Sequence, residues 1–133
     1  MADMGATVAV DSDAARRNAE VVQRFFDDVL TPPHDLDRID DLIAADFVDR
    51  TPDDGDATRA GVAAKLAALF AQDPSASFAL EALVAAGDRV AAFSVLRTGG
   101  TVTRFADLYV LWDGRIAEHR HVVEPQSGGV SLT

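Results

Sequence analysis

Two histidines separated by one residue, His119 and His121, are the side chains best suited to proton transfer in this chain. A β-strand alternates its side chains between two faces, so both imidazoles are expected to point the same way. An imidazole ordinarily titrates near neutral pH and can therefore take or give a proton. The preceding strand segment places Asp107 between Phe105 and Tyr109 at two-residue steps. Together these residues predict a small apolar pocket with acid/base chemistry.

Each polar candidate has a catalytic and a structural interpretation. His121 would move the proton, whereas His119 would orient His121 or bind a substrate carbonyl. Asp107, if buried alone, would be protonated and could donate to a developing oxyanion. If Asp107 pairs with a histidine, it stays ionised and raises the pKa of that histidine. The structural alternative for all three is a set of hydrogen-bonded side chains in a polar lining.

Length and composition limit the classes of protein to consider. The chain has 133 residues, of which 48% are hydrophobic, so one domain with a real core is expected. The net charge of −10 argues against a nucleic-acid partner. There is no cysteine and no run of about 18 apolar residues, which predicts a cytoplasmic protein without disulfides or a membrane span.

Helical periodicity fills the first half of the chain and strand periodicity the second. From Asp13 onward, apolar residues recur at three- and four-residue steps, which predicts a helix. Pro32-Pro33 ends this helix. Residues 1–12 are expected to be a flexible arm, 13–125 a single domain, and 126–133 a flexible tail. The expected elements are helices from 13, from about 37 and after the Thr58 cap, and strands at 47–50, 77–85, 89–98, 101–112 and 115–124.

This order predicts an α+β fold, with a curved antiparallel sheet packed against three N-terminal helices in a cone shape. Such a cone holds a small-molecule pocket between its helices and its sheet.

Three segments give the chain its resemblance to a known family. They are Ala45–Pro52, the strand–turn–strand Phe105–Ile116 and the stretch Glu118–Val123. In this order they resemble the SnoaL-like polyketide cyclases of the nuclear transport factor 2-like superfamily, with its cystatin-like fold. The resemblance covers roughly residues 14–125, and the superfamily hosts enzymes as well as non-catalytic binders.

The chain departs from the family at positions that matter for chemistry. The acid/base Asp of the family's Glu-His-Trp-Asp stretch falls on His121, and its Trp falls on Arg120. Ketosteroid isomerases, similar in fold, place their base near Arg50, and a cation cannot serve as that base. Asp107 matches the position at which those isomerases keep a protonated Asp as an oxyanion donor.

The resemblance implies a homodimer that pairs through the outer sheet face, with a small hydrophobic molecule as ligand. The expected function is cofactor-free acid/base catalysis on an apolar carbonyl compound, by aldol-type cyclisation, isomerisation or dehydration. Arg50 would hold an anionic substrate group or form a surface ion pair, and Phe105 and Tyr109 would contact the substrate. His119, His121 and Asp107 also suit a first-row metal ion, but the resembled families imply a metal-free site. The alternatives are a non-catalytic small-molecule binding domain and a dimerisation module with a plugged pocket.

Overall fold

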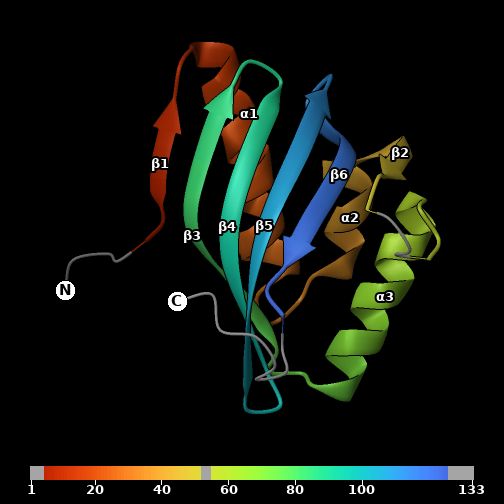
Figure 1. Cartoon of the computed structure of the whole chain (residues 1–133). Coiled ribbons are helices and arrows are strands. Elements are labelled where there is room, and N and C mark those ends of the chain that lie inside the picture. The colour runs from red at the N-terminus through yellow and green to blue at the C-terminus, as the bar shows by residue number, and fades with distance from the viewer. Residues whose placement is uncertain (1–4, 52–54, 126–133) are drawn as a thin grey trace.

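Short helices occupy the first half of the chain and long strands the second (Figure 1). The computed structural model describes residues 5–51 and 55–125. The elements are β1 (Thr7–Val10), α1 (Asp13–Arg24), the π-helical turn η1 (Phe25–Val29), the 3-10 turn η2 (Leu36–Arg38), α2 (Ile39–Leu42), β2 (Ile43–Asp49), α3 (Arg59–Gln72), β3 (Ser77–Ala86), β4 (Arg89–Thr98), β5 (Thr101–Trp112) and β6 (Arg115–Val123).

Side-chain caps set the starts of the two long helices. The Ser12 hydroxyl accepts a hydrogen bond from the Ala15 N–H at the start of α1, at 3.0 Å. The predicted Thr58 cap of α3 is confirmed, since its hydroxyl accepts from the Gly61 N–H at 3.1 Å. The second helix is shorter than predicted, because the chain turns extended at Ile43.

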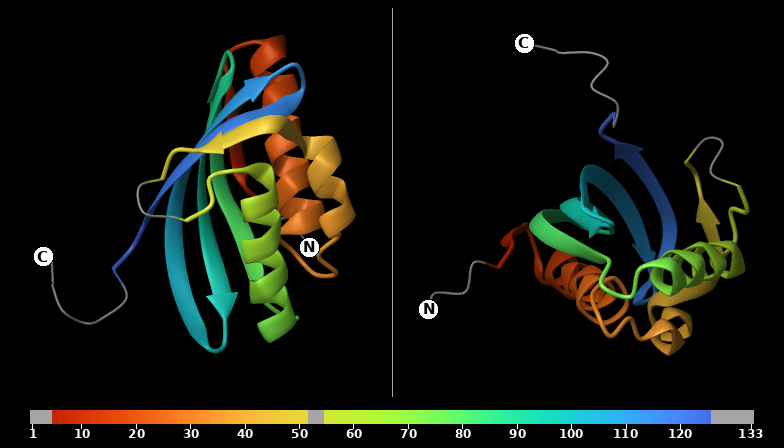
Figure 2. Two further views of the ribbon diagram at one scale, coloured as in Figure 1. Left: turned by 90° about the vertical axis from the view of Figure 1, so that its right-hand side faces the viewer. Right: turned by 90° about the horizontal axis from the view of Figure 1, so that it is seen from below.

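The six strands form one open, curved sheet in the order β1-β3-β4-β5-β6-β2. The predicted antiparallel meander of β3, β4, β5 and β6 is confirmed, as is the α+β class. The sheet as a whole is mixed, however, because β1 runs parallel to β3 and β2 runs parallel to β6. The sheet bends around the helices, which lie on its concave side (Figure 2).

The expectation that residues 1–12 form a flexible arm is wrong for Thr7–Val10. These residues form β1, which pairs with Ala82–Ala85 of β3, so the domain begins before residue 13. An edge strand of four residues, three of them exposed, shows no alternation of buried and exposed positions that sequence analysis could detect. The predicted tail at 126–133 lies outside the described residues.

The hydrophobic core fills the space between the helices and the concave sheet face. Phe26, Ile39, Leu83, Leu111 and Ile116 are each at most 2% exposed. None of the described helices is both long and apolar enough to cross a membrane.

The convex sheet face carries apolar side chains that the described residues leave exposed. Phe93 is 50% exposed and Val122 is 72% exposed. They belong to one cross-strand row, in which Phe93 pairs with Ala82 and Ala106, and Ala106 pairs with Val122. This row is the apolar centre of the outer face.

Candidate functional site

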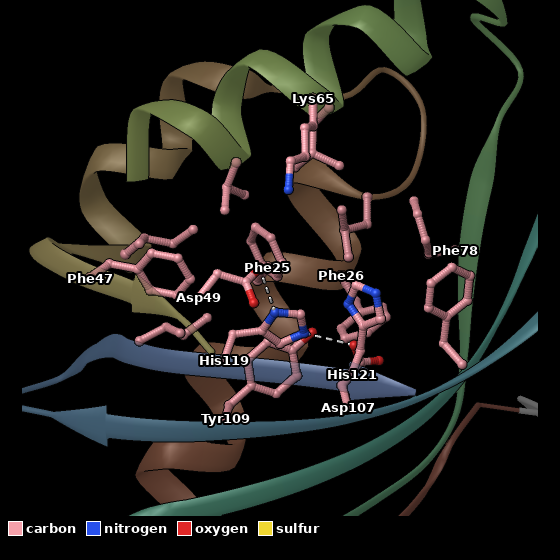
Figure 3. A pocket seen from close by; sticks show the side chains of 16 residues that line it. Phe25, Phe26, Phe47, Asp49, Lys65, Phe78, Asp107, Tyr109, His119 and His121 are labelled. Atoms are coloured by element: carbon pink, nitrogen blue, oxygen red, sulfur yellow. Dashed lines mark hydrogen bonds and ion pairs between the residues drawn. The ribbon is translucent and has the colours of Figure 1, made fainter. Parts of the chain in front are cut away.

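A cavity of about 140 Å³ lies between the helices and the concave face of the sheet (Figure 3). Its size is comparable with an engineered cavity of about 150 Å³ that holds benzene, so it can enclose about one ring. A pocket plugged by side chains is therefore not what the fold contains. The lining residues are Phe25, Phe26, Leu30, Ile43, Phe47, Asp49, Val62, Lys65, Leu66, Phe78, Phe105, Asp107, Tyr109, Ile116, His119 and His121.

Strands β5 and β6 supply the polar floor of this cavity. Antiparallel pairing sets Asp107 opposite His121 and Tyr109 opposite His119. Because alternate residues of a strand share a face, these four side chains all line the cavity, together with Phe105. The prediction that both imidazoles point inward, beside Asp107, is confirmed.

His119 lies between two aspartates. Its Nε2 is 2.8 Å from Asp107 Oδ1, and its Nδ1 is 3.4 Å from Asp49 Oδ2. Burial opposes a charge on this ring, but the hydrogen bonds and negative charges of Asp107 and Asp49 outweigh burial and raise the His119 pKa from 6.5 to about 9. At neutral pH His119 is therefore an imidazolium that donates from both nitrogens.

The hydrogen bond between His119 and Asp107 decides whether Asp107 is a protonated donor or an ionised partner of a histidine. A carboxylate that accepts a hydrogen bond from an imidazolium cannot at the same time be a protonated oxyanion donor. The geometry matches the second alternative, in which an ionised Asp107 raises the pKa of a histidine. This arrangement also makes His119 a poor general base at neutral pH, since it already holds both protons.

Asp49 is the second carboxylate of the site and comes from the end of β2. Burial raises the pKa of Asp49, but hydrogen bonds from His119 and Thr51 lower it by more, so that the net pKa lies well below its usual range. The Thr51 N–H donates to Asp49 Oδ1 at 2.9 Å. Asp49 is thus held as a carboxylate with one oxygen toward His119.

Thr51 also ties β2 to β6 beyond the last residue of the strand. Its hydroxyl accepts a hydrogen bond from the His121 backbone N–H at 3.0 Å, where a regular strand would offer a carbonyl. The Arg50 N–H likewise donates to the His119 carbonyl at 2.7 Å. One threonine therefore positions both Asp49 and the backbone of His121.

The His121 ring is bound differently from the His119 ring. No hydrogen bond joins either of its ring nitrogens to any residue in 5–51 or 55–125. Its neighbours are Phe105, with ring centroids 5.5 Å apart and planes at 73°, and His119, at 5.3 Å. A ring held only by packing keeps its nitrogens available to a ligand in the cavity.

Tyr109 forms the back of the cavity floor. It is 4% exposed, and its ring centroid lies 4.9 Å from that of His119 and about 6.5 Å from that of Phe25. Burial, with the negative charges of Asp107 and Asp49, raises the pKa of Tyr109 well above its ordinary value. Tyr109 is therefore a neutral phenol in contact with the imidazolium.

The structure does not place Arg50 at the cavity, contrary to the expected role in substrate binding. Its Nε donates to Glu118 Oε1 at 2.8 Å, and its side chain is 49% exposed. Adjacent residues at a strand end point to opposite faces, so Arg50 points outward when Asp49 points inward. The alternative prediction, a surface ion pair, is what the structure shows, with Glu118 as the partner.

Two charged residues of the cavity, Asp49 and Lys65, were not predicted as site residues from the sequence. Asp49 had a usable signal, because it lies two residues after Phe47, and an apolar inward-facing residue predicts the direction of its i+2 neighbour. Lys65 lies on the apolar stripe of α3 between Val62 and Leu66, yet it is exposed and looks like an ordinary surface lysine. The sequence of α3 around Lys65 does not indicate that this helix covers the cavity.

The floor also contains the one group of three potential metal ligands found among the described residues. Ligand atoms of Asp107, His119 and His121 all lie within 4.8 Å of one another. Two imidazoles and a carboxylate suit a first-row metal ion. The proton on His119 Nε2, held by Asp107, would have to leave before that nitrogen could bind a metal.

Comparisons with solved structures show the same fold. A candidate polyketide cyclase from Bacillus cereus ATCC 10987 matches with a TM-score of 0.79 and 19% identity, over 90% of this chain and 85% of that one. An NTF2-like protein of unknown function from Mesorhizobium loti matches with a TM-score of 0.72 and 29% identity, over 90% and 99%. A candidate ketosteroid isomerase from Kribbella flavida DSM 17836 matches with a TM-score of 0.65 and 17% identity, over 90% and 89%.

Comparison with curated proteins finds no match. A family model described as a SnoaL-like domain matches residues 22–119, a range that includes Asp49, Asp107 and His119. Since this match spans most of the chain and agrees with the fold, the chain belongs to the SnoaL-like domain family.

Proposed function

We propose that this SnoaL-like protein is a small-molecule enzyme. It would use cofactor-free acid/base catalysis on an apolar carbonyl compound, in an aldol-type cyclisation, an isomerisation or a dehydration. The observation that carries the proposal is the contrast between two imidazoles in one apolar cavity. His119 is charged and held by two aspartates, whereas His121 has no hydrogen-bond partner for its ring among the described residues.

The contrast assigns a different role to each imidazole. His121 takes the proton from a carbon next to the substrate carbonyl, and the electron pair of that C–H bond becomes an enolate. The enolate oxygen gains negative charge, which the fixed charge of the His119 imidazolium stabilises. The 3.4 Å contact between His119 Nδ1 and Asp49 is the longer of its two hydrogen bonds, and it is the one that a substrate oxygen can replace. Asp107 keeps the imidazolium charged and oriented.

Two further features support this function. The walls of the cavity are mainly apolar, which strengthens electrostatic interactions beside them. The structural relatives named as candidate polyketide cyclase and ketosteroid isomerase suggest carbonyl substrates, at identities that by themselves establish only the fold. The missing carboxylate base of the family is then replaced by His121.

Hydrogen–deuterium exchange on a carbonyl probe tests the proposal without knowledge of the natural substrate. Phenylacetone has one ring that the cavity can enclose and acidic hydrogens next to its carbonyl. In D₂O the wild-type protein should accelerate loss of the α-hydrogen NMR signal, and His121→Ala should reduce that acceleration at least tenfold, in line with the about 10²–10⁴-fold contribution of a general base. Arg120→Gln, on the adjacent outward-facing residue, is the matched control and should exchange like wild type.

Equal exchange by wild type and His121→Ala would remove His121 from the mechanism. The second candidate function is a non-catalytic domain that binds or sequesters a small molecule. It is favoured by one observation, namely that both ring nitrogens of His119 are already engaged. Tight binding of phenylacetone to the wild-type protein with no accelerated exchange would support this binding function and refute catalysis.

A further inference from the structure

Helix α3 covers the cavity on the side opposite the polar floor, and it brings one cation to that side. Val62, Lys65 and Leu66 of α3 all line the cavity. Figure 3 shows the Lys65 side chain descending from α3 with its amine toward the space above Asp49, His119 and His121. Lys65 is the only lysine of the chain, and no arginine is among the cavity-lining residues within the described part.

The amine lies at the rim of the cavity, next to the segment that precedes α3. A Cβ placed on Gly55 would lie 3.7 Å from Lys65 Cε and 4.0 Å from its Nζ. Hydrogen bonds from Thr58 lower the pKa of Asp56, and the positive charge of Lys65 contributes to this lowering. Asp56 is fully exposed, so its electrostatic interaction with Lys65 is screened by solvent and weak.

The charges of the cavity are separated in space. The floor contains the carboxylates of Asp49 and Asp107 and the imidazolium of His119, and these three groups together carry a net negative charge. The roof contributes the positive charge of Lys65. A carboxylate on a ligand would therefore lie more favourably beside Lys65 at the roof than beside Asp49 and Asp107 at the floor.

The cavity volume leads to the same orientation. About 140 Å³ encloses one ring, so the rest of a larger ligand must extend toward the rim. We propose that the cavity binds amphipathic organic carboxylates, with an apolar ring enclosed between the apolar walls and the carboxylate paired with Lys65. This inference deepens the proposed function by naming the class of substrate, and it rests on the same cavity.

The pairing with Lys65 gives the substrate a defined direction. A carboxylate fixed at the roof points the remainder of the molecule at His121 and His119. Lys65 is then a positioning and specificity-determining residue that takes no proton itself. The anionic group that sequence analysis assigned to Arg50 is thereby assigned to Lys65.

Binding of two matched probes tests the inference without any chemistry. 3-Phenylpropionate and 3-phenylpropanol share a ring and a chain length but differ in charge, and NMR titration gives a Kd for each. Wild type should bind the carboxylate about tenfold more tightly, as a charge-assisted hydrogen bond at a partly exposed site allows. Lys65→Met should abolish this preference, Lys65→Arg should keep most of it, and Arg50→Met, outside the cavity, should leave it unchanged.

A second measurement uses the single lysine directly. Reductive ¹³C-methylation keeps the charge and labels Lys65 and the N-terminal amine only. Addition of 3-phenylpropionate should shift the Lys65 methyl signal, and 3-phenylpropanol should shift it less. A carboxylate preference that survives in Lys65→Met, or its absence in wild type, overturns the inference. Because neither readout involves turnover, such a failure is distinguishable from a failure of the His121 mechanism.

Discussion

The His119 imidazolium predicts a pH dependence of stability at alkaline pH. The pKa of His119 is raised from 6.5 to about 9 in the folded protein, against the burial of its ring, by Asp107 and Asp49. A group with a raised folded-state pKa stabilises the fold fully below its unfolded pKa, and this contribution disappears as the pH rises to the folded value. The stabilisation by His119 is therefore lost over a pH window from 6.5 to about 9.

The size of the effect follows from the same shift. Each unit of pKa corresponds to about 1.4 kcal/mol, so the free energy of unfolding should fall by about 3 kcal/mol across this window. The His119 side chain is only 14% exposed, so solvent screening removes little of this amount. For a domain of this size such a loss is a large part of the total stability.

Urea denaturation at half-unit steps from pH 6 to 10 measures the loss, with Asp107→Asn as the comparison. Asparagine keeps the shape and an acceptor oxygen for His119 Nε2 but removes the charge. The loss of stability over the window should therefore be smaller in Asp107→Asn than in wild type, and other titrating groups cancel in the difference. Identical pH profiles for the two proteins would refute the assignment of His119 as a charged partner of Asp107.

Three further outcomes are expected. Thr51→Val should lower the free energy of unfolding by about 1–2 kcal/mol, because the His121 N–H loses its acceptor, and Thr51→Ser should restore it; equal stability of all three proteins would contradict the role of the hydroxyl. Asp49→Asn should lower the His119 pKa less than Asp107→Asn does, since its contact is 3.4 Å rather than 2.8 Å, and the reverse order in an NMR titration would count against the geometry. We propose that the chain pairs through its outer face, as the family resemblance implies; Phe93→Lys, in the apolar centre of that face, should then yield a monomer in sedimentation, whereas an unchanged mass would exclude pairing through this face.

Period-two alternation was sufficient to predict the part of the floor that β5 and β6 supply. It placed His119 and His121 on one face of β6. It placed Phe105, Asp107 and Tyr109 on one face of β5, and the pairing of these strands brings both sets to the same side of the sheet, at the cavity. A tight Asp113-Gly114 turn between the two strands makes this pairing local in sequence. Patterns that involve residues close together in the chain can be recognised from the sequence alone.

The parts that sequence analysis missed depend on contacts between distant segments. Asp49 meets His119 across 70 residues through the parallel pairing of β2 with β6, and parallel pairs leave no turn signal in the sequence. Lys65 reaches the cavity because α3 packs over it, which its own helical pattern does not reveal. Strand register decides that Asp49, and not Arg50, points into the cavity, because a shift of one residue turns a side chain to the opposite face of the sheet.

The protonation of His119 at neutral pH is the most direct test of the whole account. Ring nitrogen chemical shifts of ¹⁵N-histidine-labelled protein report both nitrogens, and a titration from pH 5 to 10 gives the midpoint. We predict that both nitrogens of His119 carry protons at pH 7 and that the ring loses one near pH 9. A neutral His119 at pH 7, with one bare nitrogen, would contradict it.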